Sequence, residues 1–160
     1  MTQYNLKGET LILRVKKAPI IVSVMLFALA FVSFILPLTG LIFGVFMGHG
    51  FHFGYLIGLF LFGLIGYYLL RVSLWNTYGQ EILKFGRSTI VYQADYGWFK
   101  DGAQHISRKD VICYTEKLGY EADDTDVLII TNTTEAIRSV VKMPTSEIET
   151  LLKHITTLIT

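Results

Sequence analysis

Two histidines, His49 and His52, are the first residues whose types and spacing could support chemistry. Imidazoles three residues apart could share a metal ion or change charge together near neutral pH. A metal site needs further ligands, and no carboxylate or cysteine lies near this pair in the sequence. We therefore expect a plain polar turn at this point.

An acidic cluster further along the chain could bind a hard cation. Its members are Glu121, Asp123, Asp124 and Asp126. Alternating carboxylates suit Ca²⁺, but an EF-hand loop also has a glycine at its sixth position and a closing glutamate. This stretch has neither, so the sequence predicts a solvated hairpin loop and no metal.

A third set, Asp95, Asp101 and His105, has the residue types of general acid–base catalysis. These residues flank a predicted turn, and nothing in the sequence fixes their geometry. The lone cysteine, Cys113, falls within a predicted strand, where a buried and inert thiol is the default. No glycine-rich loop follows a strand and opens a helix, so nucleotide binding has no support. We expect a protein without a catalytic residue or a cofactor.

The dominant stretch of the chain, residues 18–70, contains no Asp, Glu, Lys or Arg. A membrane-spanning helix needs about 20 apolar residues, so this stretch is long enough for two. The first span is predicted from Ile20 to about Leu36. At Pro37 the helix either stops or kinks and continues to about Met47, and the kinked, longer helix is the favoured interpretation. The second is predicted from Phe53 to about Trp75. Together they form a hairpin that occupies residues 18–75.

The charges that flank the hairpin predict its orientation. Lys7, Arg14, Lys16 and Lys17 precede the first span, Arg71 follows the second, and the turn between them carries neither Lys nor Arg. The positive-inside rule places both termini in the cytoplasm and the turn on the outside. Arg14, Lys16, Lys17 and Arg71 are also the expected contacts with lipid headgroups.

Glycines recur every four residues in both spans, which gives each helix a smooth face. The two triplets are Gly40, Gly44 and Gly48, and Gly50, Gly54 and Gly58. Small residues at this spacing let helices approach closely in lipid. The favoured interpretation is packing of the two faces within one hairpin, and the alternative is a homo-oligomer formed through one face.

Outside the hairpin, short alternating runs predict an antiparallel sheet or small barrel in residues 76–160. The N-terminal residues 1–17 contribute a strand that must join this sheet. A capping box at Ser146–Glu149 and an apolar stripe predict a C-terminal helix over residues 145–159. The predicted strands are Glu81–Phe85, Thr89–Tyr96, Ala103–Ser107, Val111–Lys117, Val127–Thr131 and Ala136–Met143, with a turn at 98–101.

This layout resembles the small bacterial membrane proteins with a pleckstrin-homology-like (PH-like) domain, in particular the YcxB-like group. The resemblance covers about Gly79 to the end of the chain. It rests on Ile112–Glu116, Asp126–Ile130 and Val141–Pro144 leading into residues 145–148. It implies an α+β membrane protein of the bacterial inner membrane, with a two-helix hairpin, a cytoplasmic PH-like β domain and a closing helix. It implies no reaction.

The composition narrows the class of partner. The formal net charge of +1 gives no reason to expect nucleic acid. Residues 76–160 hold nine Lys or Arg and twelve Asp or Glu, a net charge of −3 that does not attract an anionic lipid surface. We expect a membrane-anchored adaptor that contacts membrane lipid and another protein, the latter through Trp98 and Phe99 on a turn.

Two other classes remain open from the sequence alone. One is an immunity protein or accessory regulator of a toxin or membrane complex, which would have one specific partner. The other is an oligomeric transport component. Transport usually requires charged residues within the membrane, and residues 18–70 have none.

Overall fold

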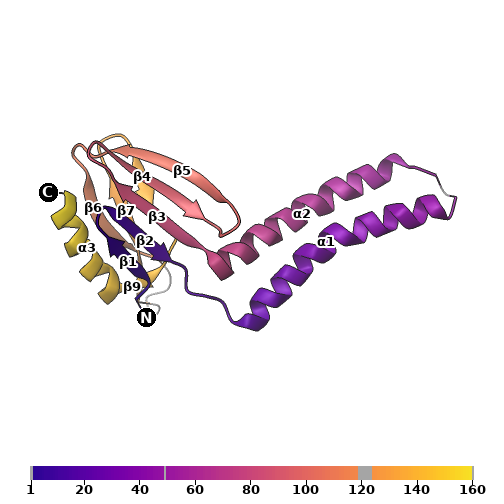
Figure 1. The fold of residues 1–160 in the computed structure, drawn as a ribbon, viewed down its shortest axis with the longest axis horizontal. Helices are drawn as coiled ribbons and strands as arrows, with labels where there is room; N and C mark the ends of the chain where they lie inside the picture. Colours follow the sequence, from indigo (N-terminus) through magenta and orange to yellow (C-terminus); the bar gives the residue numbers. More distant parts are fainter. Residues whose placement is uncertain (1, 49, 119–123, 160) are drawn as a thin grey trace. The chain divides into compact units, whose positions relative to one another are not determined.

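The computed structural model describes residues 2–48, 50–118 and 124–159, and the chain forms two compact units. One unit is the helical hairpin, Lys17–Thr77. The other, here called the β domain, joins the N-terminal residues up to Lys16 with the segment from Tyr78 onward. Figure 1 shows both as ribbons. The elements in order are β1 Tyr4–Lys7, β2 Thr10–Arg14, α1 Ile20–Phe46, α2 Phe53–Tyr78, β3 Gln80–Phe85, β4 Thr89–Asp95, β5 Lys100–Ser107, β6 Ile112–Lys117, β7 Thr125–Thr131, β8 Ala136–Arg138, β9 Met143–Pro144 and α3 Thr145–Ile159.

The hairpin consists of two long apolar helices. α1 has 27 residues and α2 has 26, which at 1.5 Å per residue makes each about 40 Å long. α1 continues past Pro37 to Phe46, so the prediction of a long first helix is confirmed. α2 ends at Tyr78, three residues beyond the predicted end. Ser33 donates a hydrogen bond to the Leu29 carbonyl (2.8 Å), which satisfies its hydroxyl within the helix.

Both helices are long and apolar enough to cross a membrane, and their surfaces are uncovered. Only 11% of the most apolar window of α1 and 6% of that of α2 is buried. The core helix of a water-soluble protein would be mostly buried. Large apolar side chains such as Ile20, Phe46 and Phe60 are among those that remain exposed.

Sheet A contains five antiparallel strands in the order β1-β2-β3-β4-β5. The N-terminal hairpin enters this sheet because β2 pairs with β3, with Leu13 opposite Glu81. Between Tyr92 and Ala94 the register of β4 and β5 shifts, and two residues of β5 stand opposite one of β4. Gly102 lies in this bulge with φ +63°, a left-handed conformation that glycine adopts without strain.

Sheet B contains β6, β7 and β8, with β9 paired to β7. The prediction of one strand over Ala136–Met143 is wrong. The structure has two short strands here, β8 and β9, separated by residues 139–142. α3 packs on β6, β7 and β9 and begins at Thr145. Ser146 therefore lies inside the first turn instead of capping it, which corrects the predicted capping box.

Apolar side chains of both sheets and of α3 form one core in the β domain. The described strands make two separate sheets and do not close into a barrel, because β5 and β8 form no ladder with each other. The α+β class with antiparallel sheets is confirmed, and the barrel alternative is corrected. Core members with an exposed fraction of 1% or less include Leu11, Leu13, Leu83, Phe85, Ile90, Ile106, Leu128, Ile130, Ile148, Leu151 and Ile155.

Candidate functional site

The residue types suited to acid–base catalysis lie apart along sheet A. Asp95 accepts a hydrogen bond from the Gly97 amide (2.8 Å) and lies 3.9 Å from the Lys100 ammonium. Asp101 accepts one from the Gly102 amide (2.7 Å). His105 is paired with Val91 on β4, four residues from Asp95, or about 13 Å along the strand. The ladder therefore does not gather these three groups in one cleft.

The other chemical candidates give no assembled site among the residues that the structure describes. His49, Glu121 and Asp123 lie outside those residues, and the described part holds no group of three or more His, Cys, Asp or Glu placed to bind a metal ion. The His52 ring lies 6.1 Å from that of Tyr55. Asp124 has φ +40°, a left-handed conformation that aspartate tolerates better than most residues.

Burial governs the chemistry of Cys113 on β6. The thiol is half-buried, and this burial raises its pKa to about 11. The thiolate is the reactive form of cysteine, so Cys113 is almost entirely in the unreactive thiol form at neutral pH.

Two glycines bring the hairpin helices together. A Cβ on Gly44 would overlap the Tyr55 side chain, and a Cβ on Gly66 would lie 2.9 Å from the Phe34 ring. In each contact, an aromatic ring of one helix packs against a glycine of the other helix. A Cβ on the other glycines of the two triplets would meet no atom within 4 Å within this chain; these are Gly40, Gly48, Gly50, Gly54 and Gly58.

Four residues form a row across one end of sheet A. Arg14 on β2 is paired with Gln80 on β3, Gln80 with Asp95 on β4, and Asp95 with Lys100 on β5. The chain leaves this end toward α1 and returns to it from α2. Of the expected headgroup contacts, Arg14, Lys16 and Lys17 are exposed and Arg71 is half-buried.

The predicted interface residues Trp98 and Phe99 lie in the β4–β5 turn beyond this row. Trp98 is 64% exposed. Phe99 is half-buried and stacks on Tyr96, with ring centroids 4.8 Å apart. The predicted turn at 98–101 is shorter than expected, because β5 already begins at Lys100.

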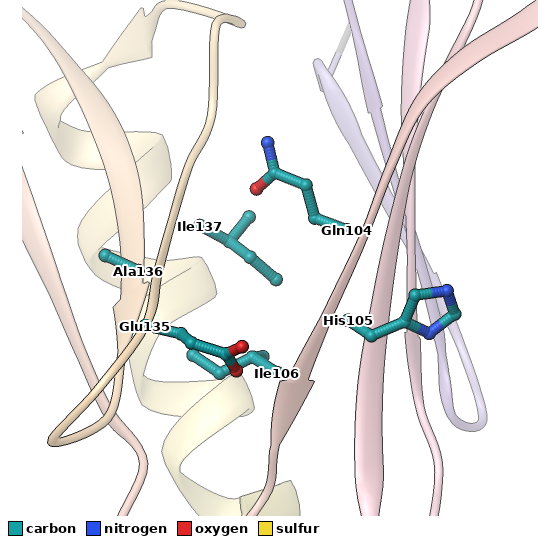
Figure 2. Close-up of a pocket in the computed structure, with 6 residues that line it drawn as sticks. All are labelled: Gln104, His105, Ile106, Glu135, Ala136 and Ile137. Carbon is teal, nitrogen blue, oxygen red and sulfur yellow. The ribbon is translucent and has the colours of Figure 1, made fainter.

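An open groove of about 380 Å³ lies between β5 and β8 and is lined by residues 104–106 and 135–137. Figure 2 shows Gln104 and Ile137 extending into the space between the strands, while the His105 ring points away from it. Ile106 and Ile137 are buried at its floor, with exposed fractions of 1% and 3%. The groove therefore has an apolar floor and a polar rim.

The groove is bordered by two open sheet edges. On either side of β8, the Glu135 carbonyl and the Ser139 amide form hydrogen bonds on the side of β7, so the alternation of an antiparallel ladder turns the backbone groups of Ala136 and Arg138 outward. Directly after β5, the Arg108 amide donates to the Ser88 carbonyl on the side of β4. By the same alternation, the backbone N–H and C=O groups of His105 point outward, toward the open edge.

Asn132 joins these two edges at one end of the groove. Its Nδ2 donates to the Ser107 carbonyl at the outer edge of β5 (3.2 Å). Beyond this bridge no ladder covers either edge in the described part of the chain. The groove is therefore bordered by backbone donors and acceptors that a further strand could use.

A buried carboxylate, Glu81, joins sheet A to the segment after β8. Its Oε1 accepts hydrogen bonds from the Tyr92 hydroxyl (2.9 Å) and the Val140 amide (2.6 Å), and its Oε2 accepts one from the Ser139 hydroxyl (2.5 Å). Burial raises the pKa of Glu81, and these hydrogen bonds oppose the rise. The pKa of Tyr92 is also raised, by burial and then by the charge of Glu81.

This network was not identified from sequence, although one signal was available. Alternation along β3 puts Glu81 on the same face as Leu83 and Phe85, and all three have exposed fractions of 1% or less. A carboxylate on the same strand face as two apolar residues indicates a buried acid. Its partners Ser139 and Val140 are 58 and 59 residues away in the sequence, and no local pattern identifies them.

Comparison of the chain with models of protein families, with curated proteins and with solved structures finds no match in any of the three.

Proposed function

We propose that the chain is a non-enzymatic adaptor of the bacterial inner membrane. In this proposal α1 and α2 cross the bilayer, the turn between them faces the periplasm, and both termini and the β domain lie in the cytoplasm. The uncovered apolar surface of both helices is the observation that carries the anchor. The basic residues before α1 support the orientation, because cytoplasmic flanks carry the excess of Lys and Arg.

The β domain supplies the adaptor function through the groove between β5 and β8. The open edges that border this groove carry this part of the proposal. An extended segment of a partner protein adds to such an edge by main-chain hydrogen bonds, and side-chain pockets give specificity. Buried Ile106 and Ile137 would receive an apolar side chain of that segment. The short antiparallel strands followed by one helix support the PH-like interpretation of the domain.

The orientation is tested by cysteine labelling in intact cells. In a Cys113→Ser background, Phe51→Cys reports on the turn between the helices and Ser88→Cys reports on the β3–β4 turn. Both positions are exposed. A membrane-impermeant maleimide should label only Phe51→Cys in intact cells and both variants after lysis. Labelling of Ser88→Cys in intact cells would contradict the orientation.

Partner binding is tested by a proline on the open edge. Ala136→Pro removes an outward N–H from β8 without removing a ladder bond, a position at which sheets tolerate proline. Ala136→Val keeps the N–H and serves as the matched control. We expect wild type and Ala136→Val to retain a stoichiometric partner from mild-detergent extracts, and Ala136→Pro to lose it while keeping the wild-type circular dichroism spectrum. Equal retention by all three would refute edge pairing.

A further inference from the structure

The β4–β5 turn, Tyr96–Phe99, projects beyond the end of sheet A that carries both connections to the hairpin. Asp95 and Lys100 are the last pair of the β4–β5 ladder, and the turn follows directly. The same row includes Gln80, which follows α2 by two residues, and Arg14, which precedes α1 by six. Neighbouring strands are about 5 Å apart. The turn is therefore one strand away from the residue at which the chain returns from α2.

The turn also touches the last residue of α2. A Cβ on Gly97 would lie 2.8 Å from the Cβ of Tyr78, so the turn backbone packs against this side chain. Gly97 has φ +85°, a conformation that L side chains rarely adopt. The contact with Tyr78 therefore holds the turn against the first residue of the second segment of the β domain.

The conformation of the turn is fixed without help from Trp98. The Tyr96 amide donates to the Phe99 carbonyl (2.9 Å), and the Gly97 amide donates to Asp95 (2.8 Å). The Tyr96 and Phe99 rings stack with an interplanar angle of 13°. Trp98 is left 64% exposed at the tip. A large aromatic side chain presented on a rigid turn has little entropy to lose when it enters a second surface.

The length of α2 places its end at the level of the lipid headgroups. The helix is about 39 Å long, and the hydrocarbon core of a bilayer is about 30 Å thick. The excess must lie in the headgroup layers or be absorbed by tilt. Tryptophan favours this layer because its ring is apolar and its indole N–H is polar. Lys100 and Asp95 have opposite charges, so the base of the turn does not repel an anionic surface.

We propose that the Tyr96–Phe99 turn is a second membrane contact, in which Trp98 inserts among the headgroups of the leaflet at which α2 ends. The inference rests on the proposed membrane anchor and deepens it. Trp98 then restrains the β domain against the bilayer, and the groove between β5 and β8 remains the surface for a protein partner. This assigns Trp98 to lipid instead of to the protein contact that its sequence context predicted.

The two tryptophans of the chain make the test internally controlled. Trp75→Phe leaves Trp98 as the sole reporter of the turn, and Trp98→Phe leaves Trp75 as the reporter of α2. Each full-length variant is placed in phosphatidylcholine–phosphatidylglycerol nanodiscs. Emission is measured with nitroxide-labelled lipid carrying its label at the headgroup, and separately with iodide as an aqueous quencher.

We expect the headgroup nitroxide to quench the fluorescence of Trp98 as strongly as that of Trp75. The emission of Trp98 should be shifted to the blue, and iodide should quench it only weakly. Strong quenching of Trp98 by iodide and none by nitroxide would overturn the inference while leaving the anchor intact. Protection of Trp98 from both quenchers would also overturn it, in favour of a protein contact. If nitroxide quenches neither tryptophan, the membrane anchor itself is wrong.

Discussion

Glu81 has a fully buried carboxylate that receives three hydrogen bonds, and its titration should control the stability of the β domain. Two effects compete at this site. Burial disfavours the charged carboxylate, and hydrogen bonds from Ser139, Val140 and Tyr92 favour it. Burial is the larger effect, so the pKa of Glu81 is raised above its ordinary value of 4.5.

The direction of the pH dependence follows from this shift. A carboxyl with a raised pKa in the folded state stabilises the fold when it is protonated, and this contribution is complete below the unfolded pKa. It is lost as the pH rises through the folded pKa. Each bound proton gives a slope of at most about 1.4 kcal/mol per pH unit. Relative to a Glu81→Gln variant, which cannot titrate, the wild type should therefore lose stability as the pH rises above about 4.5.

The effect of removing the carboxyl can be worked out from its hydrogen-bond partners. Glu81→Ala leaves the Tyr92 hydroxyl and the Val140 amide without an acceptor, while the Ser139 hydroxyl keeps the Val141 carbonyl at 3.3 Å. A buried donor left unpaired costs about 1–3 kcal/mol. Of these two donors only the Tyr92 hydroxyl is buried, since Val140 is 62% exposed, so the expected loss in the free energy of unfolding is roughly 1–3 kcal/mol.

The assay is urea unfolding of the full chain in dodecyl maltoside, followed by tryptophan fluorescence between pH 4 and pH 8. The measured quantity is the free energy of unfolding of wild type minus that of Glu81→Gln at each pH. A difference that rises with pH would show that the hydrogen bonds outweigh burial, and a flat difference would show that the pKa is not shifted. Either result refutes the reasoning.

Three further predictions concern other parts of the chain. Gly66→Ala should destabilise the hairpin by about 1–3 kcal/mol, because its Cβ would lie 2.9 Å from the Phe34 ring; thermal unfolding in detergent measures the loss. Cys113, with its pKa raised to about 11, should react with Ellman's reagent at pH 7.5 on the order of 100-fold more slowly than an exposed cysteine. Arg108→Met should cost about 2 kcal/mol and speed amide exchange in the last turn of α3, because Arg108 donates to the carbonyl of Leu158 (2.5 Å).

Each of these predictions has a matched control. Gly63→Ala should leave the hairpin stability unchanged, since its Cβ would meet nothing within 4 Å. Ser88→Cys in a Cys113→Ser background supplies the exposed thiol. Lys109→Met removes a neighbouring exposed cation and should leave α3 exchange at the wild-type rate. An equal effect of a variant and its control would contradict the corresponding prediction.

Much of the fold could be predicted from the sequence because its signals are local. The absence of charge from residues 18–70 predicts two helices whatever the rest of the chain does. Alternation in Glu81–Phe85 and Thr89–Tyr96 predicts strands for the same reason. The resemblance to the YcxB-like group and the assignment of a cytoplasmic location stay predictions.

Where the local signal failed, hydrogen bonding to another part of the β domain decided the structure. The run 136–143 reads as one strand, but the Ser139 hydroxyl and the Val140 amide bond to Glu81 on the other sheet, and the strand is interrupted there. Trp98–Asp101 reads as a turn, but Asp95 pairs with Lys100 and extends β5 to that point. In the first place a contact remote in sequence, and in the second the pairing of a hairpin, replaced the conformation that local propensity favoured.

The sequence by itself determined the apolar helices, the basic flank before them and the antiparallel character of the rest, because each depends on residue type and short-range periodicity. Only the tertiary structure decided that β5 and β8 border one groove, that Glu81 has three donors, and that Trp98 lies at the end of the sheet that receives α2. Those relations depend on strand register and on chain segments tens of residues apart. No residue pattern within a single element encodes them.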